Sequence, residues 1–261
     1  MTTDKIFSEI ENISKSAVLK AGLIAKEYKN KISVKYKSKN QPVTEADTAI
    51  DDFLKSFFKR ETPEFGWVSE ESNDDKSRFS SEFFWCVDPI DGTRSYISGK
   101  PEYTISLALI KKNRAILGCI FNPETNEFFF AKKDRGAFCN DKKIYVNKNK
   151  DITSSIYAIS NSEIKKLEQF NFFKKENIIK IGSIAYKIAL VAKGKIDVAL
   201  SFTKKNDWDL AASDLILREA GGNIKKMNGE DIIYNSNVMN VSSVIACNNE
   251  LIQELCVKLN D

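Results

Sequence analysis

The sequence predicts a chain in two parts, an α+β half followed by an alternating α/β half. Two helical patterns and then several strands with short connections occupy residues 1–148. From about residue 150 strand-like and helix-like segments alternate, as they do in a layered α/β unit. We therefore predict a division into residues 1–148 and residues 149–261, with no flexible linker marked between them.

The first half begins with two predicted amphipathic helices. Apolar side chains at helical spacing predict the first helix over residues 4–29. A half-exposed strand over residues 32–36 and a polar loop over residues 37–42 follow it. Thr44 is placed to cap the second helix, which we expect to run through Phe58.

The rest of the first half reads as a sheet. The apolar run at residues 83–87 predicts a buried strand, and a further strand ends at residues 67–68. Three segments with short connections predict an antiparallel meander, at residues 103–110, 115–121 and 127–131.

The second half alternates between the two types of element. The predicted pairs of strand and helix are 156–159 with 162–170, 178–181 with 183–193, 196–200 with 209–220, and 244–247 with 250–259. Gly221-Gly222 suits the left-handed end of the third of these helices.

The segment WCVDPIDGTRSY at residues 85–96 is the most informative part of the chain. Asp88 and Asp91 follow the predicted buried strand, and Gly92-Thr93 opens a tight turn in which a ligand can approach the backbone. Carboxylate oxygens in such a place suit a hard cation such as Mg²⁺. Backbone N–H groups beside a metal suit a phosphate, so the segment predicts a metal-assisted phosphate site.

Other acidic residues have simpler explanations in the sequence alone. Glu70 and Glu71 in VSEES fit a solvated acidic turn. Asp47 fits the first turn of a capped helix, and Asp209 fits an N-cap that interacts with the helix dipole. Spacing does not show whether any of them lies beside the central segment.

The composition restricts the chemistry to carboxylates, hydroxyls, lysines and thiols. The 261-residue chain has no histidine, which excludes Ser-His-Asp hydrolysis, HExxH zinc sites and any His general base. The net charge is +4, and lysines spread along the chain favour a solvated surface over nucleic-acid binding. Five cysteines without CxxC indicate free thiols in a reducing compartment. With neither a signal peptide nor a membrane-length apolar run, we expect a cytoplasmic protein that does not bind membranes.

Three segments resemble the signatures of the inositol monophosphatase superfamily. They are Glu70-Glu71-Ser72, Trp85–Thr93 with its DPIDGT, and Trp208–Gly222, which reads WDLAASDLILREAGG. Further family-like segments, in order along the chain, are PVTEAD at 42–47, GAFCN at 136–140 and GSIAYKIALVAKGKID at 182–197. The resemblance implies a layered αβαβα sandwich, commonly a homodimer, that acts as a Mg²⁺-dependent, lithium-sensitive phosphomonoesterase on a small-molecule phosphate ester.

Carried over residue by residue, the resemblance implies two to three Mg²⁺ ions and an attacking water. The implied metal ligands are Glu70, Asp88, the Ile90 carbonyl, Asp91 and Asp209. Glu71 would lie just outside them or touch a weakly bound third ion. The implied catalytic residues are Glu70 and Thr93, with the Thr93 hydroxyl oriented by Asp47. The implied substrate contacts are Asp91, Gly92, Thr93, Arg94, Ala185, Lys187 and Asp209.

The resemblance leaves several substrates open. The polyol-binding carboxylate of inositol monophosphatases would fall near Phe202, which is a departure from the family. Lys204 and Lys205 are candidates to pair with the second phosphate of 3′-phosphoadenosine 5′-phosphate, and Arg94 resembles the histidinol phosphatases. We favour inositol monophosphate, followed by the bisphosphate nucleotide. A regulatory or RNA-associated binding module on the same fold is the alternative of another class, which loss of a ligand carboxylate would indicate.

Overall fold

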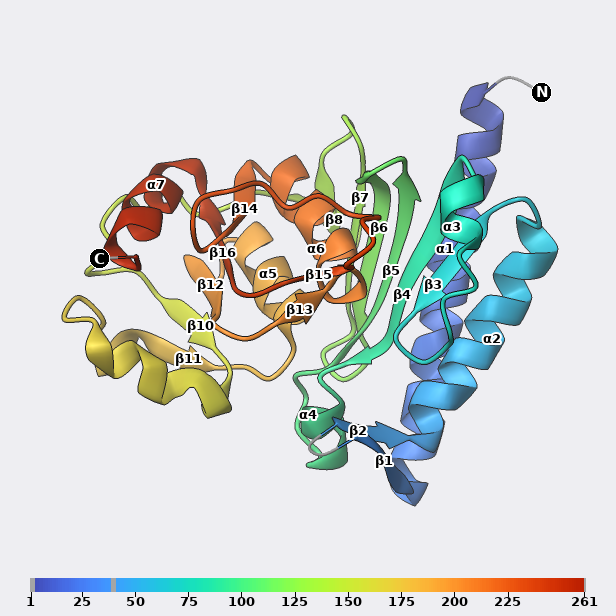
Figure 1. Ribbon diagram of the computed structural model, residues 1–261, viewed down its shortest axis with the longest axis horizontal. Helices are drawn as coiled ribbons and strands as arrows, with labels where there is room; N and C mark the ends of the chain where they lie inside the picture. Colours follow the sequence, from blue (N-terminus) through green and yellow to red (C-terminus); the bar gives the residue numbers. More distant parts are fainter. Residues whose placement is uncertain (1–2, 39–40, 261) are drawn as a thin grey trace.

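The protein is built from alternating layers of helices and sheets. A computed structural model describes residues 3–38 and 41–260. From one side of Figure 1 to the other, the layers are α1 (Thr3–Tyr28) with α2 (Glu45–Glu61), a larger sheet, α5 (Ile184–Ala192) with α6 (Asp207–Glu219), a smaller sheet, and α7 (Asn249–Lys258). This arrangement confirms the predicted αβαβα sandwich.

The larger sheet is antiparallel except at one edge, where β3 runs parallel to β4. Within the described residues its order is β3-β4-β5-β6-β7-β8-β9. Its strands are β3 (Gly66–Ser69), β4 (Phe83–Asp91), β5 (Thr104–Lys111), β6 (Arg114–Asn122), β7 (Glu127–Lys132), β8 (Ala137–Cys139) and β9 (Lys142–Ile144). The predicted meander is confirmed as β5, β6 and β7. The sheet extends further to β8 and β9. The sequence did not predict these two strands, because strands this short show no recognisable period.

The smaller sheet combines parallel and antiparallel pairs in the order β11-β10-β12-β16-β14. Its strands are β10 (Tyr157–Ile159), β11 (Ile178–Lys180), β12 (Val198–Ser201), β14 (Gly222–Lys226) and β16 (Val244–Asn248). β14 lies outside the predicted elements, because its sequence GNIKK is mostly polar. Its pairing with β16 makes it a strand.

The structure corrects three local predictions. Part of the expected loop over residues 37–42 belongs to a hairpin of β1 (Val34–Ser38) and β2 (Gln41–Thr44), while residues 39–40 lie outside the described part of the chain. The helix expected over residues 162–170 is the 3₁₀ helix η2 (Asn161–Gln169), which i→i+3 hydrogen bonds close at both ends. Asp209 is the third residue of α6 and not its N-cap, since the preceding backbone already turns at Asn206.

The remaining elements are short. They are η1 (Lys29–Lys31), α3 (Ser77–Ser80), α4 (Thr93–Ile97), η3 (Lys175–Asn177), β13 (Lys205–Asn206) and β15 (Asn240–Val241). In the described part of the chain, no helix is both long and apolar enough to cross a bilayer.

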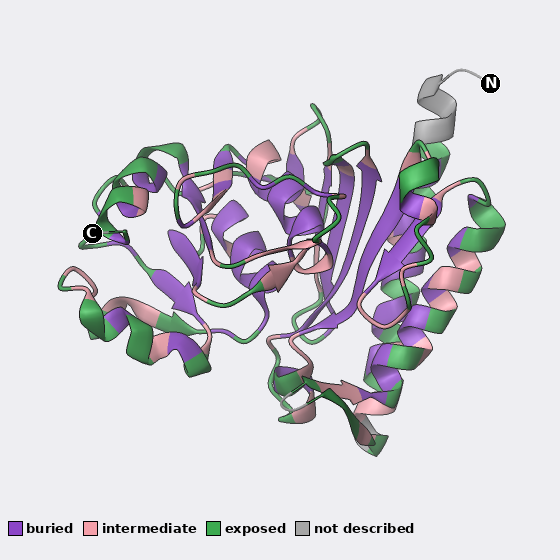
Figure 2. Ribbon diagram, viewed as in Figure 1, coloured by how far each residue is buried: buried purple, intermediate pink, exposed green. Residues whose placement is uncertain are grey.

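The central helices α5 and α6 are buried between the two sheets, as Figure 2 shows by their largely buried residues. Small side chains allow this close packing. A Cβ on Gly118 of β6 would lie 2.7 Å from the carbonyl oxygen of Ala212 on α6. Because α6 is pressed against the larger sheet here, its first turn is held at a fixed place beside the end of β4, and that turn carries Asp209.

Candidate metal centre and active site

A cavity of about 650 Å³ lies among the loops at one end of the larger sheet. Residues from distant parts of the chain line it, including Glu70, Asp88, Asp91, Thr93 and Asp209. The structure therefore brings together the acidic residues whose proximity spacing alone could not establish.

A β-bulge explains how both aspartates of the central segment reach this cavity. Residues three apart on a regular strand point to opposite faces of the sheet. On β4, however, Asp88 pairs with Ser106 and Asp91 with Thr104, so the register shifts by one residue between them. Pro89, which has no N–H to donate to a ladder, lies within this irregular stretch. Asp88 and Asp91 both line the cavity as a result.

Three carboxylates are close enough to share a cation. Glu70, Asp88 and Asp209 each offer an oxygen atom, and these atoms lie within 4.8 Å of one another. Within the described residues, the buried Oδ1 of Asp88 has no hydrogen-bond partner. A buried carboxylate oxygen without a partner is costly, and an all-oxygen donor set is what Mg²⁺ prefers. The residues present therefore fit a divalent cation.

The electrostatics of this cluster point the same way. Burial raises the pKa of Asp88 well above its usual value, and the neighbouring carboxylates Glu70, Asp91 and Asp209 raise it further. Burial, together with Asp91 and Glu70, likewise raises the pKa of Asp209 to about 8. A cation among these oxygens would reverse both effects, because it favours the charged form of each carboxyl.

Asp91 lies beside the cluster and is held by the start of α5. Its Oδ2 accepts hydrogen bonds from the Ser183 hydroxyl and, at 2.6 Å, from the Ala185 N–H. Ser183 is also the N-cap of α5 and accepts from the Tyr186 N–H at 3.0 Å. Burial raises the pKa of Asp91, while these hydrogen bonds oppose the effect. Ala185 is itself fully buried, and the group it directs at the site is a backbone N–H occupied by Asp91.

The Thr93 hydroxyl is positioned by the first turn of α2. Its oxygen lies 3.2 Å from Oδ1 of Asp47 and 3.1 Å from the Ile90 carbonyl oxygen. Oδ2 of Asp47 accepts from the backbone N–H of Thr44 at 2.8 Å, which completes a capping box. Burial raises the pKa of Asp47. The preceding Gly92 has φ of 98°, and a Cβ there would lie 2.9 Å from the Glu102 carbonyl oxygen, so only glycine fits this turn.

The β1–β2 hairpin brings a lysine to the edge of the cluster. Lys37 Nζ lies 2.6 Å from Oε1 of Glu71 and 3.3 Å from Oε1 of Glu70. Burial raises the pKa of Glu71 to about 7, although the ammonium of Lys37 acts in the opposite direction. Glu71 thus lies beside Glu70 but is paired with Lys37.

Basic residues are numerous in the rest of the cavity lining. They are Arg94, Lys100, Lys180, Lys204 and Lys205. The charge of Lys205 lowers the pKa of both Asp91 and Asp209, so this ammonium lies within electrostatic reach of the acidic cluster. The cavity therefore combines a cation site with surroundings that suit an anion.

Lys187, which the resemblance implies as a substrate contact, is fully buried in α5. Its Nζ donates to the Ser160 hydroxyl at 3.1 Å and to the Leu200 carbonyl at 3.3 Å. Burial lowers its pKa to about 8. Lys187 therefore supports the wall that contains Ser160, a residue that does line the cavity.

Glu163 also lines the cavity, although the sequence did not predict it as a site residue. Its side chain is 2% exposed and comes from η2. Oε1 of Glu163 accepts from the backbone N–H of Phe202 at 2.7 Å. Position 202, where the family resemblance implies a carboxylate and this chain has phenylalanine, therefore has the carboxylate of Glu163 beside it, contributed by η2. A glutamate in the lysine-rich stretch NSEIKKLEQ looks like an ordinary surface residue, and 39 residues separate it from Phe202, so the sequence carries no signal for this contact.

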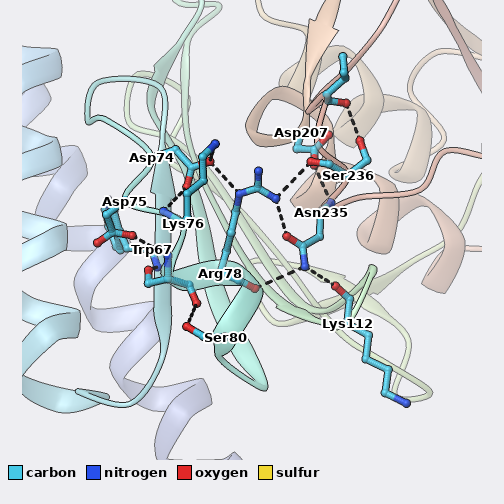
Figure 3. A network of polar contacts seen from close by, with 12 residues as sticks. Trp67, Asp74, Asp75, Lys76, Arg78, Ser80, Lys112, Asp207, Asn235 and Ser236 are labelled. Atoms are coloured by element: carbon cyan, nitrogen blue, oxygen red, sulfur yellow. Dashed lines mark hydrogen bonds and ion pairs between the residues drawn. The ribbon is translucent and has the colours of Figure 1, made fainter.

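A further polar network holds together the two segments that carry Glu70 and Asp209 (Figure 3). The buried Arg78 donates through Nε to Asp74 at 2.9 Å and through Nη1 to the Asn235 side chain at 2.7 Å. The backbone N–H of Asn235 in turn donates to Asp207 at 2.9 Å. Asp207 is the first residue of α6, so the network ties the chain after β3 to the turn that positions Asp209.

Comparisons with known proteins agree with this geometry. The model of the inositol monophosphatase family matches residues 7–260. A Nus factor SuhB from Pasteurella multocida is 31% identical over 84% of this chain and 85% of its own length. An inositol-1-monophosphatase from Mesorhizobium japonicum is 27% identical over 96% of each chain. The solved structure of a Thermotoga maritima IMPase superposes with a TM-score of 0.84, at 25% identity and with 97% of both chains covered.

The family match spans nearly the whole chain, and the fold and the acidic cavity accord with it. The protein belongs to the inositol monophosphatase family.

Proposed function

We propose that this protein is a Mg²⁺-dependent phosphomonoesterase that hydrolyses a small phosphate ester, with inositol monophosphate as the best candidate. The observation that carries the proposal is the convergence of Glu70, Asp88 and Asp209, with an Asp88 oxygen that lacks a partner in the described part of the chain. Relatives named as inositol-1-monophosphatases support the choice of substrate.

The ligand set that we propose follows the family resemblance, and the proximity of Glu70, Asp88 and Asp209 supports it. Glu70, Asp88 and the Ile90 carbonyl would hold one ion, and Asp88, Asp91 and Asp209 a second. When bound, Mg²⁺ supplies Lewis-acid activation of water and neutralises charge on the phosphate ester.

The remaining tasks fall to the chain itself. The Thr93 hydroxyl, within hydrogen-bond distance of Asp47, would orient a water molecule together with Glu70. Backbone N–H groups of Gly92 and Thr93 at the start of α4 would bind phosphate oxygens. The hydrogen bonds from Ser183 and Ala185 keep Asp91 directed at the site. No covalent intermediate on the protein is needed.

A second candidate substrate is the bisphosphate nucleotide 3′-phosphoadenosine 5′-phosphate. The basic residues of the cavity favour it, since Lys204 and Lys205 are available to pair with a second phosphate. A regulatory role is the alternative of another class, because some relatives are named Nus factor SuhB.

Phosphate release from a panel of esters tests the proposal. The panel contains inositol 1-phosphate, 3′-phosphoadenosine 5′-phosphate and histidinol phosphate, each with Mg²⁺ and with EDTA, and the ranking of kcat/KM identifies the substrate class. We expect turnover only with Mg²⁺, and added lithium tests the sensitivity implied by the family resemblance. Asp141→Asn, at an exposed residue distant in sequence from the cluster, is the control variant. Absence of Mg²⁺-dependent turnover on every ester would favour the regulatory role.

A further inference from the structure

The three clustered carboxylates come from two parts of the fold, which are held in different ways. The backbone N–H of Glu70 donates to the carbonyl of Val87, the residue before Asp88, at 3.2 Å. The pairing of β3 with β4 therefore fixes Glu70 and Asp88 relative to each other. Asp209 arrives separately, on the first turn of α6. Its place opposite the other two carboxylates depends on what holds that turn.

A buried arginine belongs to the sheet side of this junction. Arg78 lies in α3 and is 1% exposed. Its backbone packs closely on β3, because a Cβ on Gly66 would lie 2.8 Å from the Arg78 nitrogen. The preceding Ser77 also accepts a hydrogen bond from the Trp67 N–H at 3.2 Å. The backbone of Arg78 is thus fixed to β3, the strand that leads into Glu70.

The Arg78 side chain reaches across to the segment that holds α6 (Figure 3). Its Nη1 donates to the Asn235 side-chain oxygen at 2.7 Å and to the Ser236 carbonyl at 3.2 Å. The Asn235 N–H donates to the Asp207 carboxylate at 2.9 Å, and the Asp207 N–H donates to the Met239 carbonyl at 3.0 Å. Burial raises the pKa of Asp207 to about 6, whereas the positive charge of Arg78 favours its ionised form. One segment therefore holds the first residue of α6 at two points, and Arg78 joins that segment to β3.

The surroundings of the guanidinium show what each contact contributes. Asp74 accepts from Arg78 Nε at 2.9 Å, but it is also paired with Lys76 at 2.8 Å and lies on the same side of the junction. Asn235 has a second attachment, because its Nδ2 donates to the Lys112 carbonyl in the turn between β5 and β6 at 3.0 Å. Within the described residues, Nη2 of Arg78 has no hydrogen-bond partner, and a buried donor left unpaired costs stability. The contribution particular to Arg78 is the connection from α3 to Asn235.

We propose that Arg78 is a positioning residue for the metal centre, which sets the affinity for Mg²⁺ by holding the first turn of α6 against the end of β3. The inference rests on the proposed metal site and adds a residue that touches neither the ion nor the substrate. Without the bridge, a smaller fraction of molecules would have Asp209 in place beside Glu70 and Asp88, and the apparent affinity falls with that fraction. Removal of a group that directly orients a metal ligand costs about 10- to 100-fold in affinity. Because Arg78 acts through a further residue, we expect a loss at the lower end, about tenfold.

Calorimetric titration with Mg²⁺ alone tests this without relying on turnover. Arg78→Ala should raise the Kd for Mg²⁺ about tenfold. Asn235→Gly should raise it at least as much, because glycine accepts the left-handed backbone of Asn235, whose φ is 63°, while it removes the side chain that Arg78 contacts. The double variant should bind at most about twofold more weakly than Asn235→Gly, since both substitutions break the same link.

Arg218→Ala is the matched control. Arg218 donates through Nε to Asp214, four residues earlier, just as Arg78 does to Asp74. It lies near the C-terminal end of α6, whereas Asp209 is on the first turn. We expect the control to lower the free energy of unfolding in EDTA but to leave the Kd for Mg²⁺ within about twofold of wild type.

The outcomes separate this inference from the function on which it rests. A Kd for Mg²⁺ in Arg78→Ala within about twofold of wild type, or an equal loss of affinity in Arg218→Ala, would overturn the role of Arg78 and leave the phosphatase proposal standing. If the affinities follow the expected ranking but no ester is hydrolysed, the inference holds and the phosphatase proposal fails. A wild-type protein that binds no Mg²⁺ would overturn both. Should Arg78→Ala not fold, the comparison of Asn235→Gly with wild type and Arg218→Ala decides the inference.

Discussion

Replacing Asp209 by asparagine should stabilise the metal-free protein at neutral pH while abolishing turnover. Burial and the nearby carboxylates raise the pKa of Asp209 to about 8 from an ordinary value of 3.8. A raised pKa in the folded state means that stability is fully present below the unfolded pKa and is lost as pH rises through the folded pKa. The metal-free wild type should therefore lose stability between about pH 4 and pH 8.

The size of the effect follows from these pKa values. Between the ordinary pKa and pH 7, the raised pKa lowers the free energy of unfolding of the wild type by about 4 kcal/mol, at about 1.36 kcal/mol for each pH unit. Asp209 is partly exposed to the cavity, so we halve this to about 2 kcal/mol for screening by water. Asp209 also accepts from the Asn206 N–H at 2.6 Å in the capping box of α6. A pKa of about 8 leaves this carboxyl mostly protonated at pH 7, and asparagine keeps a side-chain oxygen for the Asn206 N–H, so the substitution removes little charge from the helix N-terminus. A net stabilisation of about 1–2 kcal/mol is therefore expected.

Urea unfolding in EDTA measures this difference. The free energy of unfolding should fall by about 3 kcal/mol for each molar of urea. The urea midpoint of Asp209→Asn should therefore lie about 0.5 M above that of wild type at pH 7, and the difference between the two midpoints should narrow toward pH 4. Millimolar Mg²⁺ should raise the wild-type midpoint more than that of the variant, since a ligand stabilises the state that binds it. A variant less stable than wild type in EDTA at pH 7 would contradict the raised pKa of Asp209, and equal stabilisation of both proteins by Mg²⁺ would contradict its role as a metal ligand.

Three further substitutions test other parts of the site. Asp88→Asn should lower kcat by at least about 100-fold while circular dichroism shows a folded protein, and wild-type rates would contradict the assignment of Asp88 as a metal ligand. Lys204→Ala and Lys205→Ala should raise KM for 3′-phosphoadenosine 5′-phosphate more than for inositol 1-phosphate, and equal effects would remove the argument for a second phosphate position. Arg78→Ala should cost about 1–3 kcal/mol in urea unfolding, because it leaves the Asn235 side-chain oxygen without its donor while Asp74 keeps Lys76, whereas a loss below about 0.5 kcal/mol would show that the network contributes little.

The central segment could be interpreted from the sequence because its information is local. The strand, the proline and the Gly92-Thr93 turn follow one another directly, and together they place Asp88 and Asp91 at a strand end. The absence of histidine is likewise a property of the sequence, and it restricts the chemistry before any fold is known. The helices of α1 and α2 were predictable for the same reason, since their periodicity lies within a single element.

Only the tertiary structure decided which acidic residues belong together. Spacing does not encode the packing of α6 against the larger sheet, and this packing sets Asp209 beside Glu70 and Asp88. The bulge that turns both aspartates of β4 into one cavity depends on pairing with β5. Glu163 reaches Phe202 only because η2 folds against the end of β12, and no periodic pattern records such a contact. Local sequence specifies elements, whereas side chains from separate elements meet only through the way those elements pack.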